Sequence, residues 1–103
     1  MIRFRRHPFV DLVERQLRLF GQEHSGLIRD CDTALRAYTA GSAGEAEGRY
    51  GDFLDLVDTG KDLLEEIRDT YAETLSEAAG EEYREVFNER ARKRFPRFAL
   101  ELE

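Results

Sequence analysis

The stretch "LVDTGKDLLEEI", residues 56–67, decides the fold of this chain. Val57, Gly60, Leu64 and Ile67 follow one another at spacings of three and four residues, which is the repeat of one face of an α-helix. The repeat passes through Gly60 without a slip. We therefore predict that Gly60 lies on the packed face of an unbroken helix, where its missing side chain lets another element approach closely.

The same apolar repeat extends in both directions and predicts a helix over residues 43–79. Ser42 and Glu45 have the spacing of a capping box, which marks the start of a helix. Gly80 is typical of the residue that follows a helix C-terminus. This helix is long enough to span most of a small domain.

Two further helices and a tail are predicted around it. An apolar stripe with helical spacing follows Pro8 and predicts a long helix over residues 8–39. A shorter stripe predicts a helix over 81–95, which Pro96 ends. Apolar and polar residues alternate over 96–103, which predicts an extended tail docked on the helices. The fold class is all-α: a long antiparallel helical hairpin with a short third helix, in an up-down bundle.

The unequal lengths of these helices predict a subunit interface. The third helix covers only part of the hairpin, and a second subunit is the simplest cover for the rest. We therefore expect a homodimer with a four-helix-like core. The residues expected at the interface are Phe20, His24, Tyr50, Phe53, Gly60 and Phe98.

Composition and charge limit the classes of function. The 103 residues suffice for one domain, and the net charge is −6. Residues 41–82 carry a net charge of −10, whereas residues 84–97 carry +4. This segregation favours charge matching within or between chains over a polyanionic ligand, so nucleic acid is a disfavoured partner. A single cysteine and the lack of a membrane-spanning apolar run predict a cytoplasmic protein.

Four carboxylates form an acidic stripe on the second predicted helix. Asp55, Asp58, Asp62 and Glu66 follow one another at spacings of three and four residues. Carboxylate oxygens at such spacing suit a divalent metal, so a metal-binding function is one alternative. The other interpretation is a solvated helix face.

The segment 90–97 is the candidate for binding an anion or nucleic acid. Arg92, Lys93 and Arg94 are clustered there, and they are followed by two aromatic residues, Phe95 and Phe98, of the kind that stack on bases. The competing interpretation is a basic last turn that complements the helix dipole and pairs with acidic residues of the same molecule.

The remaining reactive side chains predict no catalysis. His24 falls on the apolar stripe, where we expect it to form a hydrogen bond with a residue such as Tyr50 or Tyr71. Cys31 is expected to pack as a small apolar residue. The sequence contains no recognisable nucleophile–histidine–acid set and no glycine-rich phosphate loop after a strand, so we predict a protein that is not an enzyme.

Two stretches of the chain resemble the PhoU-like helical-bundle family. These are "MIRFRRHPFVDLVERQLRLF" at residues 1–20 and "DLVDTGKDLLEEIRDTY" at residues 55–71. The second is similar to the family's E/D-x-x-x-D helix signature, and the acidic pair would be Asp58 and Asp62. The family's second acidic signature has no counterpart here, because the third predicted helix is basic. The resemblance implies a regulatory or protein-interaction module related to phosphate uptake, with a partner such as a transporter.

Overall fold

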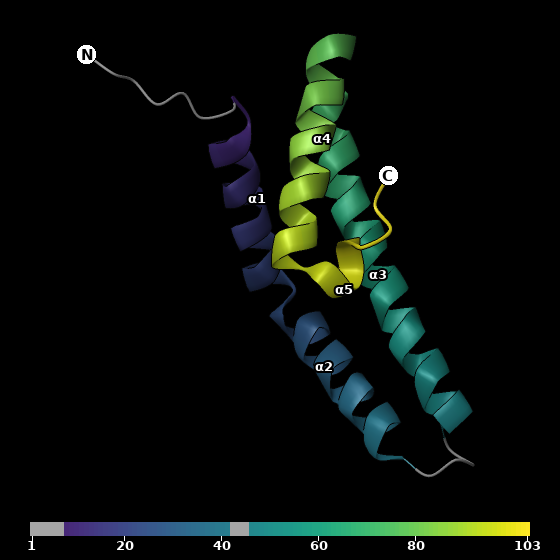
Figure 1. Ribbon diagram of the computed structural model, residues 1–103. Coiled ribbons are helices and arrows are strands. Elements are labelled where there is room, and N and C mark those ends of the chain that lie inside the picture. The colour runs from purple at the N-terminus through teal and green to yellow at the C-terminus, as the bar shows by residue number, and fades with distance from the viewer. Residues whose placement is uncertain (1–7, 42–45) are drawn as a thin grey trace.

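The computed structural model describes residues 8–41 and 46–103, and every regular element in these ranges is a helix (Figure 1). The all-α class predicted from the sequence is confirmed. The helices are α1 (Val10–Glu23), α2 (Ser25–Ala40), α3 (Ala46–Ala72), α4 (Glu77–Arg94) and α5 (Pro96–Ala99).

The first predicted helix, over residues 8–39, is interrupted at His24. Its backbone angles, φ −116° and ψ 30°, are not helical, although the His24 amide still donates to the Phe20 carbonyl at 2.9 Å. Ser25 and Gly26 follow directly, and neighbouring glycine and serine residues are a recognised cause of helix breaks. The apolar spacing runs across His24 unchanged, so periodicity alone did not reveal the division into α1 and α2.

The boundary between the second and third helices also differs from the prediction. α3 ends at Ala72, not at residue 79, and α4 begins at Glu77. Ser76 caps α4 because its hydroxyl accepts a hydrogen bond from the amide of Ala79 at 3.3 Å. Gly80 is therefore not a C-cap but a buried residue inside α4. A Cβ atom at Gly80 would lie 3.3 Å from the Ala72 carbonyl oxygen, so the glycine permits close approach to the end of α3. The predicted capping box at residues 42–45 lies outside the described residues.

The tail docks as predicted, but in a different conformation. Pro96 is the first residue of the single-turn helix α5, whereas an extended strand-like tail was predicted. The turn places Phe98, Ala99 and Leu102 on one buried side, with 4%, 0% and 1% of their surfaces exposed. Leu100 is rotated outward and is 74% exposed. The predicted alternation and the observed helical turn both bury Phe98 and Leu102. They differ at Leu100, which the alternation would bury and the helical turn exposes.

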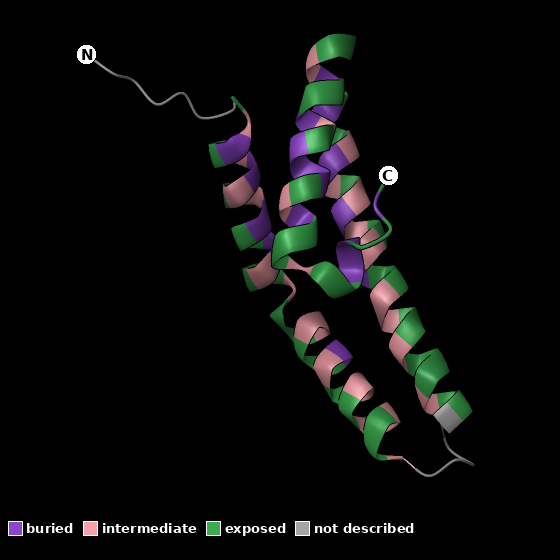
Figure 2. Cartoon of the chain, viewed as in Figure 1, coloured by how far each residue is buried: buried purple, intermediate pink, exposed green. Residues whose placement is uncertain are grey.

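The helices form two regions that differ in how many of their side chains are buried. In the region that we call the proximal bundle, α4 lies between α1 and the C-terminal half of α3, and α5 closes one end (Figure 1). The other region, which we call the distal hairpin, consists of α2 and residues 46–57 of α3. There α2 packs against the N-terminal half of α3 (Figure 1). Buried residues gather in the proximal bundle (Figure 2). Of the described residues in the distal hairpin, Cys31 alone is buried.

Candidate functional site

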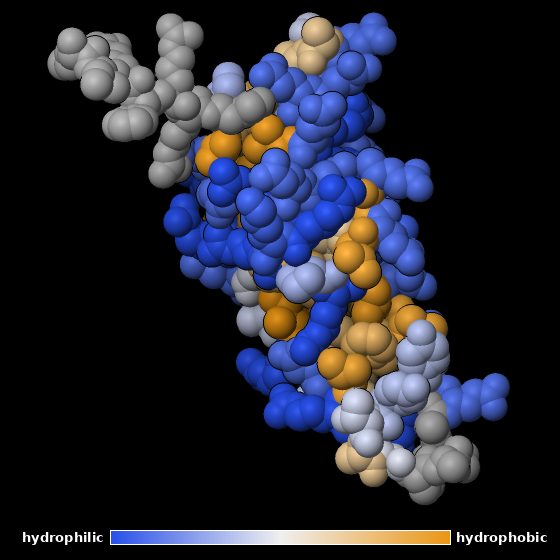
Figure 3. Space-filling model, viewed as in Figure 1, coloured by the Kyte–Doolittle hydropathy of each residue, from blue (hydrophilic) through white to orange (hydrophobic). Residues whose placement is uncertain are grey.

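A group of apolar side chains is exposed where the distal hairpin meets the tail. Tyr50, Leu54 and Leu100 are 45%, 39% and 74% exposed, and they are three of the four large apolar side chains exposed in the described ranges. Apolar surface also gathers there on the face shown in Figure 3. Together with the half-buried Phe53 and Val57, these residues form what we call the distal apolar surface.

A hollow of about 230 Å³ opens in this surface. Phe53, Leu54, Val57, Phe98 and Leu100 supply its apolar lining. Four charged residues complete the lining, two acidic and two basic: Asp58, Glu101, Lys61 and Arg97. A hollow with apolar walls and charges of both signs at its edge suits another side chain better than a small polar ligand.

Gly60 positions one wall of the hollow. Its backbone lies directly beneath the ring of Phe98, and a Cβ atom at Gly60 would lie 2.6 Å from Cγ and 2.7 Å from Cε1 of that ring. The prediction that Gly60 lies on a packed face of α3 is confirmed. The element that approaches it is α5, through a side chain, and not one of the long helices.

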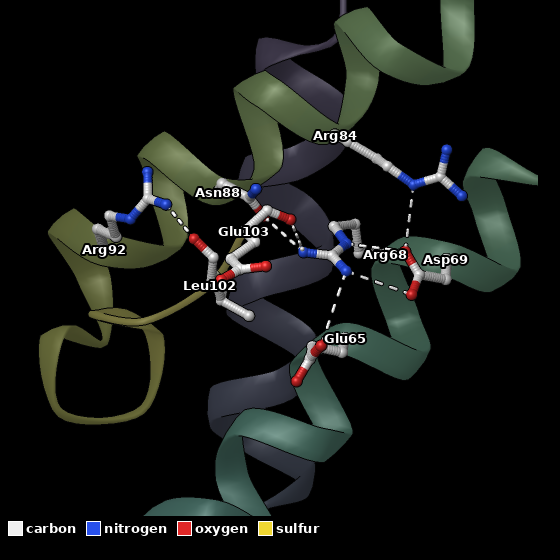
Figure 4. Close-up of polar contacts among 8 residues, drawn as sticks. All are labelled: Glu65, Arg68, Asp69, Arg84, Asn88, Arg92, Leu102 and Glu103. Carbon is white, nitrogen blue, oxygen red and sulfur yellow. Dashed lines mark hydrogen bonds and ion pairs between the residues drawn. The ribbon is translucent and has the colours of Figure 1, made fainter. Parts of the chain in front are cut away.

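Two arginines hold the tail in place through hydrogen bonds to its backbone carbonyl oxygens (Figure 4). Arg68, which is only 6% exposed, donates from Nη1 to the carbonyl oxygen of Glu103 at 3.0 Å and to Oδ1 of Asn88 at 2.9 Å. Arg92 donates from Nη2 to the carbonyl oxygen of Leu102. These bonds fix the segment that carries Leu100, so the shape of the distal apolar surface depends on them.

Arg68 is itself held by acidic neighbours. Its Nε and Nη2 atoms donate to the two carboxylate oxygens of Asp69 at 2.8 Å and 3.2 Å, and Glu65 lies 3.8 Å from Nη2. Arg84 donates from Nε to Asp69 Oδ1 at 3.2 Å. Hydrogen bonding from Arg68, supported by Arg84, holds the pKa of Asp69 below its ordinary value. Each charge has a protein partner, so the network has a structural role.

Tyr83 is the largest fully buried side chain, and both its hydroxyl and its ring contact other side chains. Its hydroxyl donates to Oε1 of Gln16 at 2.6 Å, and its ring lies against Phe9 and Tyr71. Burial raises the pKa of Tyr83 to about 12. Cys31 packs in the core as expected, and burial raises the pKa of its thiol as well. Neither group is ionised near neutral pH, which does not suit them to nucleophilic chemistry.

The structure does not bring the predicted metal ligands together. Asp55, Asp58, Asp62 and Glu66 are all exposed along α3. In the part of the chain that is described, no three His, Cys, Asp or Glu side chains are placed to hold a metal ion. The physical reason is that one exposed helix face supplies these four side chains. Glu101 of the tail lines the same hollow as Asp58, but among the described residues a third ligand does not join them.

The basic segment is neutralised within the chain. Lys93 donates to Glu89 at 3.2 Å, and Arg94 donates to Glu14 of α1 at 2.7 Å. Arg97 pairs with Asp32 of α2. With Arg92 bound to the tail, the three predicted anion-binding residues, Arg92, Lys93 and Arg94, all have protein acceptors. Charge matching was expected, but most of the acceptors lie on α1, α2 and α4 and not on the acidic helix α3.

Three of the predicted interface residues belong to the core of the single chain. Phe20, Gly60 and Phe98 are buried, and the Phe20 ring lies 5.0 Å from that of Phe95 and 6.2 Å from that of Phe98. The prediction placed them at a subunit contact because α5 was not foreseen as their cover. His24 lies against Phe20, with ring centroids 5.1 Å apart, and was expected to contact a tyrosine.

Tyr50 and Phe53, by contrast, stay at the surface, with the Tyr50 ring 5.1 Å from that of Tyr38. Sequence reasoning missed Arg68, Asn88 and Leu100. A charged residue is ordinarily assigned to the solvent side of a helix, so no pattern singled out Arg68.

No family model, curated protein or solved structure matched the chain. Within residues 8–41 and 46–103, no helix combines the length and the apolar character required to cross a membrane.

Proposed function

We propose that this chain is a non-enzymatic helical protein that works by binding a protein partner through the distal apolar surface. The observation that carries the proposal is the exposure of Leu54 and Leu100 at one hollow, with Tyr50 exposed one helical turn before Leu54. The large apolar residues of the neighbouring proximal bundle are, by contrast, nearly all covered. Contiguous apolar surface with a charged edge is typical of protein-binding sites.

The anchored tail supports this proposal. Holding an exposed leucine in one place favours binding, because a fixed side chain loses less conformational entropy when a partner covers it. Arg68 and Arg92 fix the backbone that follows Leu100, since they bind the carbonyls of Glu103 and Leu102.

A narrower form of the proposal rests on the resemblance of residues 1–20 and 55–71 to the PhoU-like family. In that form the protein is a cytoplasmic regulator related to phosphate uptake. Its partner is then either a second copy of the chain or a protein such as a transporter. A reduced single cysteine is in keeping with the cytoplasm.

Site-specific photocrosslinking in the cells of origin tests the proposal. A photoreactive phenylalanine derivative replaces Leu54 in the full-length protein, and the matched control carries it at Glu81, an exposed position on α4. We expect protein adducts from position 54 and none from position 81. Equal yields at the two positions, or no protein adduct at position 54, would reject the distal apolar surface as a binding site.

A further inference from the structure

We infer that the partner is a second copy of this chain, which docks its own distal apolar surface on the first across a two-fold axis. This inference rests on the proposed function and names its partner. A two-fold contact uses the same patch on both subunits, so the patch must be complementary to itself. Self-complementarity requires a projection and a recess on one face, and charges of both signs around them.

The first requirement is met by Leu100 and the hollow beside it. Leu100 is 74% exposed, and the same leucine borders a hollow of about 230 Å³ whose other apolar walls are Phe53, Leu54, Val57 and Phe98. A two-fold rotation therefore presents the leucine of each copy to the hollow of the other. The two insertions form together in one two-fold arrangement, so the dimer covers twice the apolar area of a single insertion.

The second requirement is met by the charged residues at the edge of the hollow. Asp58 and Glu101 are acidic, whereas Lys61 and Arg97 are basic. Asp58, Lys61 and Glu101 have no ion-pair partner among the described residues, and Arg97 pairs with Asp32. A partner with charge of one sign would be repelled by half of this edge. A second copy offers basic groups to acidic ones in both directions.

The resulting assembly covers the distal hairpin, most of whose side chains are not buried in the single chain. Two distal hairpins packed face to face place four helices around a shared core, which is a common solution for helical proteins. Tyr50 and Leu54 are then covered without any change in the proximal bundle.

Charge exchange between copies tests this inference on the purified full-length protein. One variant carries Lys61→Glu, which leaves the edge of the hollow mainly acidic. A second carries Asp58→Lys with Glu101→Lys, which leaves it entirely basic. By sedimentation velocity at about 100 µM, we expect the wild type to be dimeric, each variant alone to associate at least tenfold more weakly, and an equal mixture to recover the dimer. Glu81→Lys, which replaces an acidic by a basic residue far from the hollow, should leave the dimer intact.

Leu100→Glu should give a monomer, and circular dichroism confirms that each variant is folded. A monomeric wild type at this concentration, or a mixture of the two charge variants that remains monomeric, would overturn the inference. If the wild type is monomeric while position 54 still crosslinks to another protein in cells, the proposed function stands and the second copy is rejected as the partner.

Discussion

The proximal bundle and the distal hairpin share α3, yet only the proximal bundle encloses a core. Leu64 in the proximal half of α3 is 0% exposed, whereas Leu54 in the distal half is 39% exposed. The difference follows from α4, which packs on the C-terminal half of α3 and ends before the distal half begins. The apolar stripe of a helix thus indicates which side packs, and the neighbouring elements decide how completely that side is covered.

Truncation of a core leucine should separate the two regions most strongly. We expect Leu17→Ala in the proximal bundle to lower the free energy of unfolding by about 3 to 4 kcal/mol, because it leaves a cavity at a fully buried position. Leu54→Ala should cost less than about 0.5 kcal/mol in dilute, monomeric protein, since its side chain is partly in water. Urea unfolding measures both. Equal losses of unfolding free energy at the two positions would contradict the claim that only the proximal bundle encloses a core.

Enlargement of glycines on α3 should give the next largest effect. Gly60→Leu forces a side chain into the ring of Phe98, and we expect a loss of about 2 to 3 kcal/mol in unfolding free energy. Gly51→Leu is the matched control, because no atom lies within 4 Å of a Cβ placed there. That change should be neutral or stabilise by up to about 1 kcal/mol through helix propensity. An intact Tm for Gly60→Leu would show that α5 does not lie on α3.

Several features of the fold could be predicted from the sequence, and the reasons differ by element. The packed side of Gly60, the end of α4 before Pro96 and the docking of Phe98 follow from periodicity and from the stereochemistry of proline. The break at His24 could not be found, because a single non-helical residue leaves the spacing of its apolar neighbours unchanged. The role of Gly80 was missed because a glycine at a helix end and a glycine at a helix crossing look alike in sequence.

The candidate site was only partly predictable. Tyr50 and Phe53 were named as residues of a subunit interface because they extend the apolar stripe beyond the reach of the third helix, and the structure leaves Tyr50 exposed and Phe53 partly exposed. Leu100 was assigned to the buried side, since an alternating pattern was taken for an extended chain. Arg68 gave no signal, because its burial depends on Asn88 and on a carbonyl that is 35 residues away in the sequence.

Removal of the buried arginine should have a moderate effect. We expect Arg68→Met to cost about 2 kcal/mol, because the Asn88 side chain and the Glu103 carbonyl lose their donor. Arg84→Met provides the control at the same carboxylate. Arg84 and Asp69 are 38% and 40% exposed, and such pairs contribute less than about 1 kcal/mol. If the two substitutions cost the same, Arg68 does not anchor the tail.

The smallest effect concerns pH. The pKa of Asp69 in the folded state lies below its ordinary value of 3.8, chiefly because Arg68 donates to the carboxylate. Its contribution is therefore present above pH 3.8 and is lost as the pH falls through the folded-state pKa. The carboxylate is 40% exposed, so screening by solvent should limit the effect to less than about 1 kcal/mol. Asp69→Asn should flatten the acid side of the stability profile; an unchanged acid limb would refute this.

Hydrogen exchange at two protein concentrations tests the central claim, that the distal hairpin is open in one chain and covered by a second. Backbone amides of α2 and of residues 46–57 should exchange at least tenfold more slowly at about 100 µM than at about 1 µM, because association protects them. Amides of α4 should exchange at the same rate in both samples. Exchange in the distal hairpin that does not depend on concentration would contradict the account.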